Sequence, residues 1–140
     1  MTPNQIKLVQ TSFAQVAPIA GTAADLFYGR LFEIAPHVRA MFPDDLGEQK
    51  KKLMAMLGTA VAGLSRLETL MPAVQALGRR HGGYGVKAQH YASVGSALLW
   101  TLEKGLGEAF TPEVKDAWAT TYIVLSTTMM NAANEKPMAA

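Results

Sequence analysis

Three polar side chains interrupt rows of apolar residues that recur at helical spacing. Gln49 precedes Leu53 by four residues and His81 follows Leu77 by four, while Tyr28 takes the same place in an earlier row. This spacing puts each polar side chain on the face of a helix that packs inward. Burying a polar group without a partner costs on the order of a few kcal/mol. The three side chains therefore either satisfy one another or bind something in the core.

Each of these side chains also has a purely structural explanation. His81 ends an apolar helix, where an imidazole can be satisfied by the backbone or by the helix dipole. Gln49 can bond a neighbouring backbone group, and Tyr28 can reach solvent with its hydroxyl. Taken together, one inward imidazole and two inward hydrogen-bond donors match the needs of a haem iron, which a proximal histidine ligates in globins and peroxidases. His37 and His90 are weaker candidates, since one lies in a turn and the other at a helix start.

The elements that position these residues are predicted to be almost entirely helical, because no alternating β-branched run occurs. We expect helices over about 19–35, 45–64 and 69–81, others over 3–16, 87–105 and 111–133, and a short turn at 36–42. Threonine–proline pairs cap the first and last helices, and Asp45 is expected to cap the third. Glycines 82, 83 and 85 are expected to end the helix that carries His81. Such a set builds either a helical bundle or a globin-like stack, and periodicity does not choose between them.

Composition indicates one globular domain. Of the 140 residues, 49% are hydrophobic and 17% are charged, which excludes a disordered chain. The chain has no cysteine, a net charge of +2 and no apolar run long enough for a membrane span or a signal peptide. We therefore expect a cytoplasmic protein without nucleic-acid or membrane partners, with a domain over 1–134 and a disordered tail over 135–140.

Several longer segments carry a family resemblance. They are LFYGRLFEIAPHVRAMF (26–42), LGRRHGGYGV (77–86), HYASVG (90–95) and DAWATTYIV (116–124). Together with the 32-residue interval from Gln49 to His81, they resemble the single-domain bacterial globins and the globin half of the flavohaemoglobins over about residues 3–133. The resemblance implies an all-α globin fold of six to eight helices around a haem pocket.

The resemblance also implies the cofactor, haem b, and the residues that hold it. His81 corresponds to the proximal ligand of the iron, and Tyr28 and Gln49 to the polar residues on the distal side. The remaining implied contacts are Phe42, which stacks on the haem, and Leu53, Leu77, Val86, Tyr91 and Val94. The Leu77 carbonyl is the expected acceptor for the second nitrogen of His81. Lys52 and Arg80 are candidate partners for the haem propionates, although solvated helix faces explain them more simply.

Two functions follow from the resemblance. The first is reversible binding of O₂, CO and NO at a five-coordinate iron, by a monomer or weak homodimer. The second is NO dioxygenation, with a separate reductase as partner. Flavohaemoglobins carry a glutamate late in the last helix, at a place that falls here at about Ala133, and a proline where this chain has Ala92. The missing acid, and a length that leaves no room for a reductase domain, favour oxygen binding over an enzyme.

Overall fold

Six α-helices and four short 3₁₀ turns make up the part of the chain that the computed structural model describes, residues 1–134. The helices are α1 (Pro3–Val16), α2 (Ala20–Ile34), α3 (Gly47–Gly63), α4 (Leu67–Gly83), α5 (Ala88–Leu106) and α6 (Pro112–Asn134). The turns are η1 (Ala17–Ile19), η2 (Pro36–Met41), η3 (Leu64–Arg66) and η4 (Gly107–Ala109). The predicted all-α fold is confirmed. The tail expected over 135–140 lies outside the described residues.

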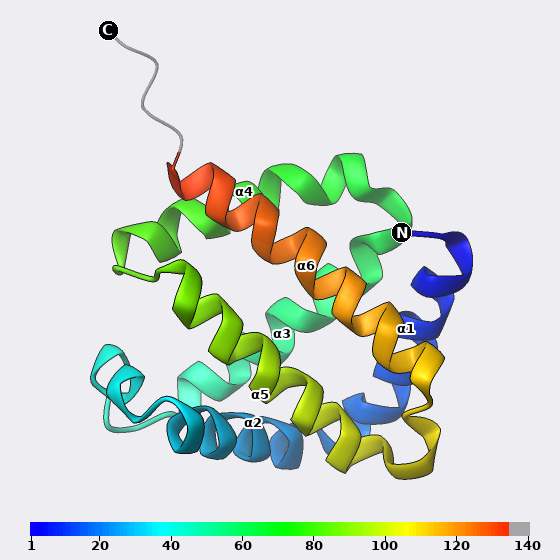
Figure 1. Ribbon diagram of the computed structural model, residues 1–140, viewed down its shortest axis with the longest axis horizontal. Coiled ribbons are helices and arrows are strands. Elements are labelled where there is room, and N and C mark those ends of the chain that lie inside the picture. The colour runs from blue at the N-terminus through cyan, green and yellow to red at the C-terminus, as the bar shows by residue number, and fades with distance from the viewer. Residues whose placement is uncertain (135–140) are drawn as a thin grey trace, which may run out of the picture.

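The helices do not line up as one parallel bundle: α6 runs obliquely to α4 and α5 obliquely to α2, whereas α5 and α6 follow nearly the same diagonal (Figure 1). The last helix, α6, packs across both α4 and α1, and α5 packs on α2. This arrangement is the globin-like alternative of the two that periodicity left open. None of the helices in the described part has the length and apolarity that crossing a membrane requires.

The crossing of α4 and α6 depends on a glycine in the middle of α4. A Cβ added at Gly78 would collide with the backbone of Met129. Glycine at this position therefore lets the two helix backbones approach closely. This close approach fixes where the last turn of α4 lies along α6.

The first residues of the helices agree with the caps predicted at the threonine–proline pairs and differ from the cap predicted at Asp45. Thr2 Oγ1 accepts the backbone N–H of Gln5 at 3.1 Å, and Gln5 Oε1 accepts that of Thr2 at 2.9 Å, which is a capping box. Asp45, expected to cap α3, is not the capping residue, because the helix begins at Gly47 after Leu46. Its carboxylate instead accepts the N–H of Gly47 at 2.9 Å, in the turn before the helix.

The end of α4 also differs from the prediction. Glycines 82 and 83 do not end the helix but lie within its last turn, and the chain leaves at Tyr84 before Gly85, whose φ is +83°. Gly82 is needed for space, since a Cβ there would lie 2.8 Å from the Cβ of Ala133 on α6. The helix thus ends against α6 and not at the first glycine.

Candidate functional site

Tyr28 is held by an aromatic cluster at the junction of α2 and η2. Its side chain is 3% exposed. Phe42, directly after η2, meets the Tyr28 ring edge-on at a centroid distance of 5.6 Å, and Phe32 lies 5.9 Å away. Sequence reasoning did not include Phe32 in the site. Its position one helical turn after Tyr28 was the available signal.

The hydroxyl of Tyr28 interacts through a side-chain hydrogen bond with Gln49 in the first turns of α3. Burial raises the pKa of Tyr28, and this bond opposes the rise only in part. Tyr28 therefore keeps its proton and can donate a hydrogen bond. An ion pair of 2.8 Å between Lys50 and Asp25 also ties the start of α3 to α2, next to this pair of side chains.

The apolar row of α3 is only partly covered by protein. Leu53 and Leu57 pack against the core but stay partly exposed, as does Leu46 just before the helix, and Val61 is the one buried residue of α3. A helix that leaves most of its apolar row half-covered provides an apolar surface for a flat hydrophobic group.

His81 lies near the end of α4, half-buried, with its ring fixed by the backbone. Its Nδ1 lies 2.9 Å from the carbonyl oxygen of Leu77, one turn earlier. A carbonyl can only accept, so Nδ1 carries the proton and the lone pair of the neutral ring is on Nε2. The Leu77 carbonyl therefore accepts the hydrogen bond from His81, as expected, and Nε2 is left to ligate a metal.

Tyr91 packs beside His81 and is anchored from α6. The two ring centroids are 6.5 Å apart, with the planes at 31°. Tyr122 donates its hydroxyl proton to the Tyr91 carbonyl oxygen at 2.6 Å, and burial raises the pKa of both tyrosines. Sequence reasoning missed Tyr122 as a supporting residue. A sign of it was Gly95 inside a helix, where a Cβ would lie 2.7 Å from the Tyr122 ring.

The other expected contact residues divide by exposure. Val86 and Val94 are partly buried against the core. Lys52 and Arg80 are exposed and form no ion pair within residues 1–134, whereas the neighbours of Lys52 in sequence, Lys50 and Lys51, pair with acids.

The structure assembles the candidate residues in two groups, one around Tyr28 and Gln49 and one around His81 and Tyr91. No hydrogen bond or ring contact joins these groups in the described part.

The remaining histidines do not form a metal cluster. His37 and His90 approach to a ring distance of 5.9 Å, and His90 Nδ1 accepts the N–H of Lys87 at 2.8 Å. Across residues 1–134 no group of three or more histidine or acidic side chains could hold an ion. A single free imidazole nitrogen suits a metal that brings its own chelating ring, and the half-covered row of α3 suits such a ring.

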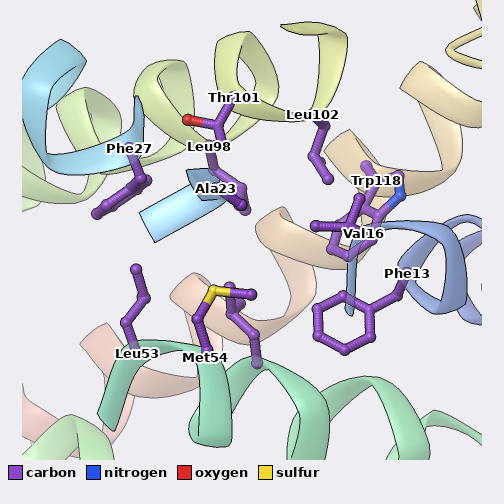
Figure 2. A pocket seen from close by; sticks show the side chains of 11 residues that line it. Phe13, Val16, Ala23, Phe27, Leu53, Met54, Leu98, Thr101, Leu102 and Trp118 are labelled. Carbon is purple, nitrogen blue, oxygen red and sulfur yellow. The ribbon is translucent and has the colours of Figure 1, made fainter. Parts of the chain in front are cut away.

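A small apolar cavity lies behind Leu53 and Met54 (Figure 2). Its volume is about 20 Å³, and side chains from α1, α2, α5 and α6 close it. The one hydroxyl in its wall, that of Thr101, already donates to the Ala97 carbonyl at 2.8 Å. A cavity of this size is close to the minimum that holds one water-sized molecule, and its wall offers no free polar group.

Comparison with known proteins identifies the family. The family model described as Globin matches residues 25–129, so the chain belongs to the globin family. It is 33% identical over 125 residues to a flavohemoprotein of Rhodopirellula baltica, an alignment covering 87% of this chain and 31% of that protein. A flavohemoprotein of Bacillus subtilis is 29% identical over 86% of this chain and 31% of its own length. The chain therefore spans about a third of these relatives.

A relative of similar length is also found. The neuroglobin of Danio rerio is 33% identical over 118 residues, covering 74% of both chains. The resemblance inferred from the sequence is confirmed, and with it the globin fold.

Proposed function

We propose that this globin holds haem b through Nε2 of His81 and reversibly binds O₂ and other diatomic ligands. The observation that carries the proposal is the bond from His81 Nδ1 to the Leu77 carbonyl, because it fixes a proton on Nδ1 and leaves Nε2 as the nitrogen available to a metal. When bound, the haem supplies an iron that takes a diatomic ligand on the side opposite the histidine.

The chain's own residues fit the two faces of such a cofactor. Leu53 and Leu57 on α3, with Leu46 just before it, offer an apolar surface, and Phe42 offers an aromatic ring. Val86 and Val94 would add apolar contacts from the α4–α5 turn and from α5, and Tyr91 would pack beside the histidine. Lys52 and Arg80 are free to meet the propionates.

Tyr28 and Gln49 set the polarity of the distal side. The protonated Tyr28 hydroxyl and the Gln49 amide are two donors close together in an otherwise apolar environment. A glutamine is a poor iron ligand, so we expect a five-coordinate ferrous iron that is open to gases. The proposal includes a cytoplasmic location, with which a cysteine-free sequence is compatible.

A second candidate is NO dioxygenation with a separate reductase. Similarity to flavohemoproteins favours it, because the name of these relatives joins a flavin to a haem protein. The chain matches only about a third of their length. Ala133, the place expected for an acid, packs on Gly82 beside His81, so no carboxylate of that residue strengthens the proximal imidazole. Reversible binding is therefore the better-supported function. Sustained nitrate formation from NO in the presence of a flavin reductase would reverse this order.

The direct test is haem binding by matched histidine variants. Purified protein titrated with hemin should develop a Soret band at one equivalent. His81→Ala should lose stable haem, and His90→Ala, which removes a histidine nine residues further on, should retain it. Normal haem affinity in His81→Ala would contradict the proposal, as would a wild-type chain without a Soret band after hemin addition.

A further inference from the structure

The first turns of α3 carry Gln49 but contribute no side chain to the apolar core. Leu46, just before the helix, and Leu53 pack against the core, whereas residues 47–52 between them are glycine or polar and none is buried. Within the described part of the chain, no side chain caps the start of this helix. Packing of an apolar face, which supplies most of the stability of helices in proteins, is therefore missing along the stretch that carries Gln49.

Two polar side-chain contacts join this stretch to α2 within residues 1–134. The Gln49 side chain is hydrogen-bonded to the Tyr28 hydroxyl, and Lys50 Nζ lies 2.8 Å from a carboxylate oxygen of Asp25. On α3, Gln49 and Lys50 are consecutive. On α2, Asp25 precedes Tyr28 by three residues, which makes the two side chains neighbours on the helix surface. The two contacts therefore lie close together between the same two helices.

The ion pair adds a constraint that the hydrogen bond alone does not provide. A single hydrogen bond fixes one distance, but it leaves α3 able to roll about its axis or to tilt away from α2. An ion pair at the next residue opposes both movements. Exposed ion pairs contribute little to the free energy of unfolding. A small contribution is sufficient here, because none of the side chains of residues 47–52 is buried.

We propose that the ion pair between Asp25 and Lys50 positions Gln49: it keeps the Gln49 amide beside the Tyr28 hydroxyl and thereby slows the release of a diatomic ligand. The inference rests on the proposed haem function. Asp25 and Lys50 are positioning residues that do not touch the ligand themselves. Their side chains are 67% and 33% exposed, so salt weakens the attraction between them, and the ligand release rate depends on ionic strength.

The test measures the O₂ dissociation rate constant of the haem-loaded protein by stopped-flow displacement with CO. Asp25→Asn and Lys50→Gln each break the ion pair and should raise this rate constant roughly two- to fivefold. One substitution removes an anion and the other a cation, so a general change of the electrostatic field would move the two rate constants in opposite directions.

Lys51→Gln is the matched control for Lys50→Gln. Lys51 lies 3.7 Å from Glu48 on the same helix, so this ion pair cannot hold α3 against α2. The same substitution one residue further along should therefore leave the O₂ dissociation rate constant unchanged.

Two double variants show whether the ion pair acts through Gln49. Exchanging the two charges, with Asp25→Lys and Lys50→Asp together, should restore the wild-type rate constant. Gln49→Leu should speed ligand release by itself, and adding Asp25→Asn to it should have no further effect, because no amide is left to position. An ion pair that only stabilised the fold would add its own effect in the Gln49→Leu background.

Salt tests the same contact in the wild-type chain, without a substitution. Sodium chloride at about 1 M screens exposed charges and should raise the O₂ dissociation rate constant to that of Asp25→Asn, while leaving Asp25→Asn itself unchanged. Amide hydrogen exchange over residues 48–52 should rise in parallel, and this measurement does not involve the ligand.

An unchanged rate constant in Asp25→Asn, in Lys50→Gln or in wild type at high salt would overturn the proposal. Failure of the charge exchange to restore the rate constant, or an additive effect in the Gln49→Leu background, would do the same. The Soret band of each sample reports haem occupancy independently. A missing band in wild type contradicts the haem function, and amide exchange then still decides whether the ion pair holds the helix. A normal band with unchanged rate constants contradicts the ion pair alone.

Discussion

Tyr28 combines burial with a hydrogen-bonding partner, and this combination determines what it can do. Burial keeps its hydroxyl protonated, and Gln49 holds it in place from another helix. Helical spacing in the sequence was sufficient to put both side chains inward, and the structure shows that they meet. Spacing could not reveal Tyr122, because its acceptor is a backbone carbonyl 31 residues earlier, on a different helix. The roles of these residues at the haem stay predictions.

Removing the Tyr28 hydroxyl should speed ligand release. A hydrogen bond to a partly charged acceptor contributes about 1.5–3 kcal/mol, and 1.4 kcal/mol corresponds to a factor of ten. Tyr28→Phe should therefore raise the O₂ dissociation rate constant by roughly tenfold or more, measured by stopped-flow displacement with CO. Tyr84→Phe, at an exposed tyrosine near His81, is the control. An unchanged rate in Tyr28→Phe would remove this residue from the distal site.

The α4 helix shows what an element contributes to the site. Its apolar row and its approximate range followed from the sequence, but its last turn did not. Gly82, which appears to end it, is there because α6 passes close by, and a contact between distant segments leaves no trace in local periodicity. Asp45 resembled a helix cap for a local reason: its carboxylate does accept a backbone N–H, but that of Gly47, in the turn before α3.

Substitution of Gly78 should disturb the packing of α4 on α6. Gly78→Ala would press a methyl group into the Met129 backbone and should lower the free energy of unfolding by about 1–3 kcal/mol, as overpacked cores do. Gly83→Ala lies in the same helix with nothing within 4 Å, so it should be neutral or slightly stabilising. Urea unfolding followed by circular dichroism measures both. Equal effects of the two substitutions would show that close helix packing is not the cause.

At the scale of the whole molecule, composition predicted one globular domain and the spacing of apolar residues predicted that it is helical, and the arrangement of the helices then selected the globin stack. The order of helices in space could not be derived from periodicity, since amphipathic rows indicate which face packs but not which partner it meets.

Buried tyrosine hydroxyl groups are distributed through this stack, and they connect its stability to pH. Burial raises the pKa of Tyr28, Tyr91 and Tyr122 in the folded chain.

Stability should therefore decline in alkali. In the unfolded chain tyrosines ionise near pH 10, whereas the folded chain holds these three protonated to higher pH. Their contribution to the free energy of unfolding is constant below about pH 10 and falls as pH rises beyond it. Urea midpoints at pH 8 and pH 11 should differ less in Tyr122→Phe than in wild type. An identical drop in both would show that Tyr122 does not contribute to the alkaline loss.

The hydrogen bond between Trp118 and Ser12 has an optical consequence. Trp118 is 2% exposed, and its indole Nε1–H donates to Ser12 Oγ at 2.8 Å in the middle of the core. Trp100 is only half-buried and has the Arg30 guanidinium at 5.3 Å and the Lys104 ammonium at 5.6 Å from its ring centroid. The two indoles should therefore emit at different wavelengths and differ in quenching by iodide, so one fluorescence spectrum follows the interior and the surface of the molecule separately.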